Sequence, residues 1–121
     1  WLEMAGNGLK LLEMAVQGLK WLEVKLSGIE QHTGTTPMHV RKDTSLAMSE
    51  IILAVNNIAY KNQPNALGSV GHIEVFPNSR NVIAGHSIFT IDFRSPDITK
   101  LDKMENELKT TFNALKAQKR R

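Results

Sequence analysis

Cysteine is absent from all 121 residues of the chain. Disulfide bonds and thiolate metal sites are therefore excluded within this sequence, and the composition fits a reducing compartment such as the cytoplasm. Long apolar runs are absent as well, so we expect no membrane-spanning helix and no membrane partner. The first residues also lack the basic and apolar pattern of a signal peptide.

Aromatic residues are scarce, at 6% of the chain, and the net charge is only +3. Much of the positive excess lies in residues 116–121, which predicts a solvated helix end. Nucleic-acid binding needs a basic surface with interleaved aromatic side chains. We therefore expect no nucleic-acid partner.

Residues 1–30 consist of three segments of ten that resemble one another, WLEMAGNGLK, LLEMAVQGLK and WLEVKLSGIE. Read as a helix, this region would carry a polar stripe that includes Lys20. The glycine near the end of each segment argues against one long helix. We divide the chain into a linker or engineered near-repeat over 1–17 and a domain over 18–121.

Two strands are predicted in this amino-terminal region, at about 9–15 and 19–27. In the second strand, Leu19 and Trp21, with Val24 and Leu26 as further candidates, are predicted to face inward.

Four further elements follow at clear apolar spacing. They are a helix over about 37–61 with Thr36 as its cap and Pro37 in its first turn, strands over 67–76 and 86–94, and a helix over about 96–117. The order strand, helix, strand, strand, helix predicts an α+β, ferredoxin-like two-layer sandwich, in which two helices cover one face of an antiparallel sheet. Its closing strand is missing or is replaced by the amino-terminal segment. An exposed sheet edge would suit dimerisation.

Residues 31–38, QHTGTTPM, place His32, a glycine and two threonines directly before the predicted helix start. Helix N-termini attract anions, and an imidazole titrates near neutrality, so this segment could bind an anion or a developing oxyanion. Spacing alone favours a simpler interpretation, in which the threonines cap the helix and His32 is a surface loop residue.

Two further side chains are candidates for substrate binding. Asn81 lies in the loop 77–85, PNSRNVIAG, and offers an amide donor and acceptor, although asparagine is also a common turn former. Arg94 ends the second predicted strand in the sequence DFR, and a guanidinium can grip a carboxylate with two parallel hydrogen bonds. The alternative is a surface salt bridge with Asp92 or Asp97, which would contribute little to stability.

The blocks QHTGTTPM, PNSRNVIAG and IDFR resemble the lid, or dimerisation, domain of the zinc-peptidase-like amidohydrolases. The branch they resemble contains the metal-dependent N-carbamoyl-L-amino-acid amidases, allantoate amidohydrolases and β-ureidopropionases, and the resemblance runs from about residue 18 to 97. It implies that His32 reaches the active site of the neighbouring subunit and helps to bind or polarise the scissile amide. It also implies that Asn81 binds substrate and that Arg94 binds the substrate's α-carboxylate. Ala84 stands where the family motif has proline, which removes a backbone constraint from this loop.

The resemblance further implies a homodimer formed through the lid, and zinc or manganese in a separate catalytic domain of the full-length enzyme. We expect no cofactor within this chain, because the family's metal-ligand motifs are absent and His39, His72 and His86 lack a zinc-binding spacing. The chain would then be a lid fragment that is inert alone, since metal-assisted hydrolysis needs the ion. The other interpretation is a stand-alone engineered or structural scaffold that self-associates and has no catalytic role.

Overall fold

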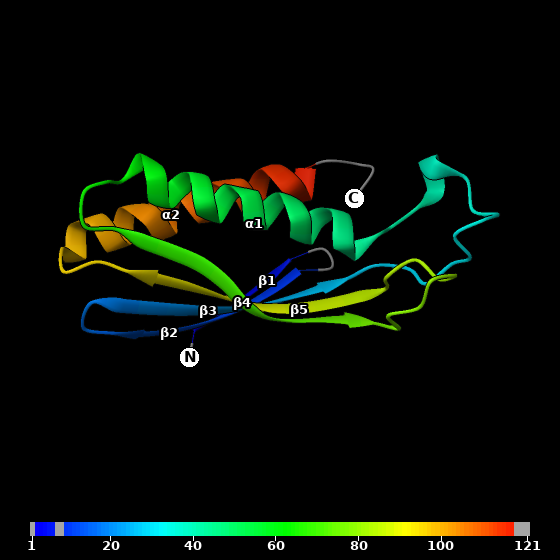
Figure 1. Cartoon of the computed structure of the whole chain (residues 1–121), viewed down its shortest axis with the longest axis horizontal. Coiled ribbons are helices and arrows are strands. Elements are labelled where there is room, and N and C mark those ends of the chain that lie inside the picture. Colours follow the sequence, from blue (N-terminus) through cyan, green and yellow to red (C-terminus); the bar gives the residue numbers. More distant parts are fainter. Residues whose placement is uncertain (1, 7–8, 118–121) are drawn as a thin grey trace.

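A sheet and a pair of helices make up the two layers of the chain, for which a computed structural model describes residues 2–6 and 9–117 (Figure 1). The sheet has five antiparallel strands in the order β1-β2-β3-β5-β4. The strands are β1 (Leu2–Gly6), β2 (Leu9–Val16), β3 (Leu19–Ser27), β4 (Leu67–Phe76) and β5 (His86–Arg94); the helices are the short 3-10 helix η1 (Met38–Val40), α1 (Thr44–Lys61) and α2 (Ile98–Ala117). Both long helices cover the same face of the sheet (Figure 1). None of the described helices is long and apolar enough to cross a membrane.

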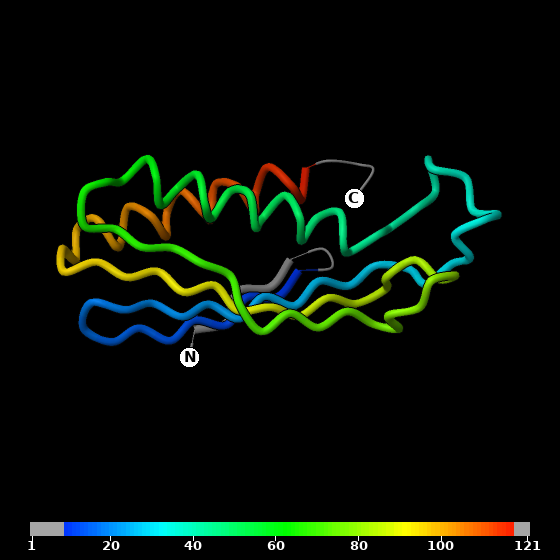
Figure 2. Tube along the Cα trace, viewed as in Figure 1, coloured from blue at the N-terminus to red at the C-terminus, as the bar shows by residue number. Residues whose placement is uncertain are grey.

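The predicted ferredoxin-like topology is confirmed. Strand β3, helix α1, strands β4 and β5 and helix α2 follow one another as expected, and β3 and β4 both pair with β5. Strand β2 pairs with the other edge of β3, which is the position of the closing strand in this fold. Figure 2 shows how the chain passes from β2 into β3 through a tight turn, where Gly18 adopts a φ of 77°. The amino-terminal segment therefore replaces the closing strand, whereas the division between 1–17 and 18–121 stays a prediction.

The structure confirms Val24 and Leu26 as inward-facing side chains of β3 but not Leu19 and Trp21. Leu22, Val24 and Leu26 are buried beneath the helices together with Lys20. Trp21 lies on the helix-free face and is 37% exposed, so the prediction that Leu19 and Trp21 face inward was wrong. The reason is that α2 supplies carboxylates to Lys20, which allows this lysine to occupy an inward position.

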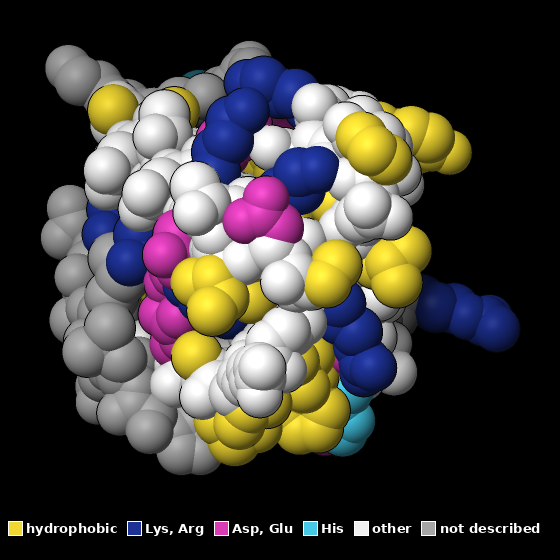
Figure 3. All heavy atoms as spheres, turned by 90° about the vertical axis from the view of Figure 1, so that its left-hand side faces the viewer, with side chains coloured by type: hydrophobic (Ala, Val, Ile, Leu, Met, Phe, Trp, Pro, Cys, Tyr) yellow, Lys and Arg dark blue, Asp and Glu magenta, His cyan; other side chains and the backbone are white. Residues whose placement is uncertain are grey.

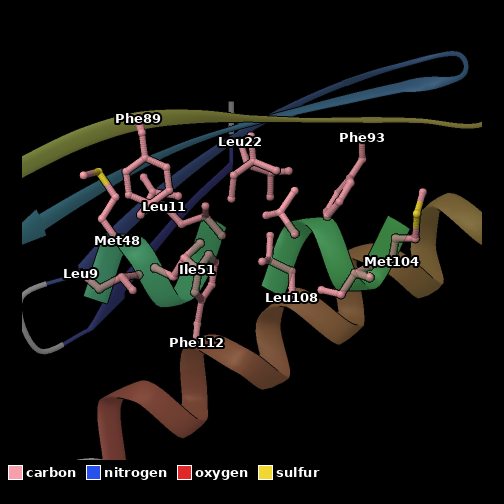
Figure 4. Close-up of a cluster of buried hydrophobic side chains, with 14 of the residues drawn as sticks. Leu9, Leu11, Leu22, Met48, Ile51, Phe89, Phe93, Met104, Leu108 and Phe112 are labelled. Atoms are coloured by element: carbon pink, nitrogen blue, oxygen red, sulfur yellow. The ribbon is translucent and has the colours of Figure 1, made fainter. Parts of the chain in front are cut away.

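The hydrophobic core fills the space between the sheet and the two helices (Figure 4). Aromatic and aliphatic side chains of the central strands point toward the helices, and the apolar stripe of each helix points back. The most deeply buried members are Leu11, Leu22, Val24, Phe89, Ile91 and Phe93 from the sheet and Ile51, Val55, Met104, Leu108 and Phe112 from the helices. The apolar spacing that predicted the last helix therefore forms its buried side. Because Leu11 belongs to β2, the replacement strand is part of this core.

The start of α1 corrects the predicted helix over 37–61. The helix ends at Lys61 as predicted but begins at Thr44, and Asp43 caps it by accepting a hydrogen bond from the Ser45 N–H at 3.0 Å. Thr36 does not cap, because its hydroxyl donates to the His32 carbonyl. Residue 42 cannot be helical, since its carbonyl accepts from the Ile29 N–H at 3.0 Å and holds this segment against the chain that leaves β3.

Strand β2 is also joined to α2 by a buried ionic cluster. Lys20 donates to Asp102 at 2.6 Å and to Glu105, and it lies 3.8 Å from Glu13 of β2. Burial, the hydrogen bond with Glu105 and the charge of Glu105 raise the pKa of Glu13 to about 7. Burial alone would raise the pKa of Glu105, but hydrogen bonds from Glu13, Lys20 and Lys109 outweigh it and lower this pKa to about 2. Near neutral pH, Glu13 is therefore the carboxyl of this pair that holds a proton.

Replacing Glu13 with glutamine is expected to remove part of the pH dependence of stability. The pKa of Glu13 rises from 4.5 to about 7 on folding, so the folded chain holds a proton that the unfolded chain releases between these values. The stabilisation from Glu13 is therefore complete below pH 4.5 and is lost as the pH rises through 7. Thermal melts should show the wild-type melting temperature falling between pH 5 and 8, and Glu13→Gln should flatten this fall.

Glu23→Gln is the matched control, because Glu23 lies on the opposite face of the sheet and pairs with Lys25 at 3.7 Å. It should keep the wild-type pH dependence. Parallel curves of melting temperature against pH for wild type and Glu13→Gln would contradict the interpretation that folding raises the pKa of Glu13.

Candidate functional site

The loops that carry His32 and Asn81 lie side by side at one end of the molecule (Figure 1). The Ile83 N–H donates to the Gln31 carbonyl at 2.8 Å, and the Thr33 N–H donates to the Asn81 carbonyl at 2.9 Å. These two bonds flank an antiparallel bridge between residues 32 and 82. The backbone therefore holds the two predicted site residues next to each other, with both side chains exposed.

The imidazole of His32 has a defined orientation. Its Nδ1 accepts a hydrogen bond from the Gly34 N–H at 2.9 Å, so the neutral ring carries its proton on Nε2. Such a ring can donate from Nε2 to a carbonyl or an oxyanion. The predicted helix N-terminus does not assist it, because α1 begins at Thr44 and its first turn is capped by Asp43.

Arg41 braces the loop that carries His32, although the sequence analysis did not single it out. Its Nη2 donates to the Thr33 carbonyl at 2.7 Å, and its Nε donates to the Thr36 carbonyl at 3.1 Å. In the sequence, the role of Arg41 is indicated only by its position as a charged residue shortly after Pro37. By donating to two backbone carbonyls, the Arg41 guanidinium stabilises the conformation of the His32 loop through its backbone rather than through the imidazole.

Three backbone segments meet at Gly28, just before this loop. The Gly28 N–H donates to the Gly85 carbonyl at 2.7 Å, and the N–H of the next residue, Ile29, donates to the Lys42 carbonyl at 3.0 Å. A Cβ at position 28 would lie 2.0 Å from the Lys42 carbonyl oxygen, so only glycine fits here. The Ala84 carbonyl in turn accepts from the backbone and the hydroxyl of Thr44. The loop is thus held at Ala84 by hydrogen bonds to the start of α1.

Arg94 lies at the other end of the sheet. His86 begins β5 beside the paired loops and Arg94 ends it, so the two ends are roughly 26 Å apart at about 3.3 Å per residue. Arg94 lines a hollow of about 520 Å³ together with Gly18, Gln63, Asn65, Ala66, Leu67, Ser95 and Pro96. Figure 3 views this end of the molecule and shows basic side chains next to hydrophobic ones. Within one chain, His32 and Asn81 lie together and Arg94 does not join them.

The Arg94 guanidinium is held by Asp92, as the salt-bridge alternative anticipated. Its Nε donates to Oδ1 at 3.0 Å and its Nη2 donates to Oδ2 at 3.1 Å. The indole Nε1 of Trp21 donates to the same Oδ2 at 3.0 Å. The hydrogen bonds from Arg94 lower the pKa of Asp92, against the opposing effect of burial, and the bond from Trp21 lowers it further. Asp92 is therefore firmly anionic at neutral pH.

No group of three or more histidine, aspartate or glutamate side chains within residues 9–117 is arranged to hold a metal ion. His72 lies 3.1 Å from Glu74 on the exposed edge strand, which is a simple ion pair when the imidazole is charged. The described residues therefore do not fit the metal of an amidohydrolase, and the candidate site residues offer hydrogen-bond donors and acceptors.

The family profile of the peptidase dimerisation domain matches residues 14–120. The N-carbamoyl-L-amino-acid amidohydrolase of Rhizobium meliloti is 52% identical over 77 residues, which cover 64% of this chain and 18% of that protein. The allantoate amidohydrolase of Escherichia coli is 36% identical over 89 residues, which cover 73% of this chain and 21% of that protein. The chain thus spans about a fifth of these curated relatives.

A solved structure is similar as well. The crystal structure of a hydantoinase/carbamoylase family amidase from Burkholderia vietnamiensis matches with a TM-score of 0.76 and 44% identity. The match covers 78% of this chain and 23% of that one. The likeness therefore concerns one part of a much longer protein.

Proposed function

Since this chain belongs to the peptidase dimerisation domain family, we propose that it is the lid of a metal-dependent amidohydrolase acting on N-carbamoyl amino acids or related ureido acids. The names of two relatives, N-carbamoyl-L-amino-acid amidohydrolase and allantoate amidohydrolase, support this substrate class. Such a lid dimerises, closes over an active site and excludes water from it. In this proposal the zinc or manganese ion and its ligands belong to a catalytic domain outside these residues, in a cytoplasmic enzyme.

The observation that carries this proposal is the separation of the site residues along β5. The carboxylate and the scissile amide of a carbamoyl amino acid are only a few bonds apart. One small substrate cannot span the roughly 26 Å between Arg94 and the paired loops of His32 and Asn81. In an assembled enzyme, Arg94 of one chain would therefore bind the carboxylate, while His32 and Asn81 of a second chain would bind or polarise the amide.

Strand β4 offers an edge through which two copies could bring these residues together. It forms one edge of the sheet, and Leu67 and Ile73 on it are largely exposed. Helix α1 packs directly over this strand, because a Cβ at Gly68 would lie 3.0 Å from the Cβ of Ala59. The outer side of α1 exposes Leu53 by 65% and Tyr60 by 73%. We call these four exposed apolar residues of β4 and α1 the α1–β4 surface.

Antiparallel pairing of two β4 edges about a twofold axis would produce the required arrangement. In the register of the sheet, Leu67 lies opposite Arg94 and Phe76 lies opposite His86. The twofold axis places the Leu67 end of one β4 along the Phe76 end of the other. Arg94 of one chain would then lie toward the paired loops of its partner.

Replacing Leu53 with lysine is expected to weaken dimerisation by roughly tenfold or more, because a charge would be buried at the interface without a partner. Sedimentation velocity over a concentration series measures this. Ile98→Lys is the matched control, since Ile98 is 62% exposed but lies at the start of α2, outside the α1–β4 surface. It should dimerise like the wild type. A wild-type chain that stays monomeric at the highest concentration, or equal dimerisation of both variants, would rule out this surface.

The same wild-type preparation should show no hydrolysis of N-carbamoyl-L-alanine with zinc or manganese added, because the described residues offer no set of metal ligands. Turnover that a chelator abolishes would contradict the proposal that the lid is inert alone.

A stand-alone self-associating scaffold is the second candidate. It is favoured by strand β2, which fills the position of the closing strand and packs Leu11 into the core. Metal-ligand motifs encoded on either side of these residues would favour the lid, and a reading frame without them would favour the scaffold.

A further inference from the structure

We propose that Trp21 is a positioning residue for carboxylate binding by Arg94, acting through Asp92. This inference rests on the role proposed above for Arg94. The three side chains lie on the helix-free face of the sheet, where Trp21 of β3 is directly opposite Asp92 of β5 and Arg94 follows two residues later. Each is joined to the next by a hydrogen bond of 3.0 to 3.1 Å.

The geometry leaves one edge of the guanidinium available to a ligand. Arginine has five N–H donors, and Asp92 accepts from Nε and from one hydrogen of Nη2. Three donors remain, and one on Nη1 together with the one on Nη2 forms the end-on edge that can hold a carboxylate with two parallel bonds. Arg94 also lines the hollow of about 520 Å³ at this end of the molecule. An incoming carboxylate therefore meets the end-on edge, provided that Asp92 keeps the side edge occupied.

Trp21 fixes Asp92 in the orientation that this arrangement requires. Its indole N–H binds Oδ2, the same oxygen that accepts from Nη2 of Arg94. Without this donor, the carboxylate of Asp92 could turn about its side-chain torsions, and the exposed Arg94 side chain could turn with it. A solvent-exposed ion pair contributes little to stability. Loss of the Trp21 N–H should therefore affect ligand binding much more than folding.

The test is an NMR titration of the full chain with N-carbamoyl-L-alanine, followed through the backbone amides around position 94, which the wild type and every variant retain. N-carbamoyl-L-alaninamide, which lacks the carboxylate, is the negative control ligand. Trp21→Phe keeps an aromatic ring but removes the donor, and should weaken carboxylate binding about tenfold, as expected for one hydrogen bond to a charged group. It should also raise the pKa of Asp92 toward its ordinary value, a shift that a merely structural role would not produce.

Thr90→Val is the matched control variant, because Thr90 lies beside Asp92 on the same sheet face and lines the same shallow hollow as Trp21. It should bind like the wild type. If the wild type and Arg94→Gln both fail to bind, the proposed role of Arg94 is wrong and this inference is wrong with it. If Arg94→Gln abolishes binding while Trp21→Phe binds like the wild type, the inference about Trp21 alone is overturned.

Discussion

Replacing Lys20 with methionine is expected to destabilise the chain by about 3–5 kcal/mol, the usual cost of removing one partner from a buried ion pair. Lys20 is only 9% exposed and is the cation that Glu13 and Glu105 share beneath α2. Methionine is unbranched and only one heavy atom shorter than lysine, so most of the packing is kept. The loss would leave the buried carboxyl groups of Glu13 and Glu105 facing each other with only Lys109, 3.2 Å from Glu105, as a counter-charge. Urea unfolding at pH 7 measures the change.

Two further variants make this result specific. Lys25→Met changes a lysine of the same strand on the opposite face, where it pairs with Glu23 at 3.7 Å, and should cost less than about 1 kcal/mol. Adding Glu13→Gln and Glu105→Gln to Lys20→Met should recover most of the stability, because no buried charge then remains. Equal urea midpoints for the two single lysine variants would show that the cluster contributes little.

Replacing Gly28 with alanine is expected to destabilise the chain at the upper end of the roughly 1–3 kcal/mol typical of overpacking. The added methyl group would lie 2.0 Å from the Lys42 carbonyl oxygen and 3.1 Å from Cγ2 of Thr44. The chain cannot relieve this contact without breaking the hydrogen bond from Ile29 to Lys42. Urea unfolding gives the loss of stability, and hydrogen exchange should show faster exchange of the Thr33 amide next to His32.

Gly71→Ala is the matched control for this substitution. Gly71 lies in β4, and a Cβ there would meet no atom within 4 Å. Its effect should stay within about 0.5 kcal/mol. If both glycine variants have the same stability, the junction of the three segments at Gly28 does not hold the His32 loop.

The alternation of apolar residues predicted most of this fold. The strand over 86–94 matches because a half-buried strand shows its period of two directly in the sequence. The strand over 67–76 matches in its bounds, although most of its side chains are exposed. The start of α1 could not be predicted in this way. Thr36 and Pro37 form a suitable local signal, but long-range hydrogen bonds from Ile29 to Lys42 override it. The inward position of Lys20 in β3 was also not predictable from local sequence, because its carboxylate partners Asp102 and Glu105 come from α2.

The candidate site was predictable only in part. Sequence motifs identified His32, Asn81 and Arg94, but not which of them lie together, because that depends on the direction of β5 between two loops. The contact of Trp21 with Asp92 is visible only once the register of β3 on β5 is known. Gly28 donates to a backbone carbonyl far along the chain, and Arg41 donates to carbonyls five and eight residues before it. No local sequence pattern indicates such partners.

Strand β2 has a consequence for how the sheet assembles. A closing strand after α2 would pair with β3 across most of the chain, and the entropy lost in closing so long a loop slows folding. Strand β2 instead reaches β3 through a turn at residues 17–18 and forms a hairpin with it. The edge of the sheet is thereby completed by a local contact, which lowers the contact order of the chain and allows this hairpin to form before α2 docks.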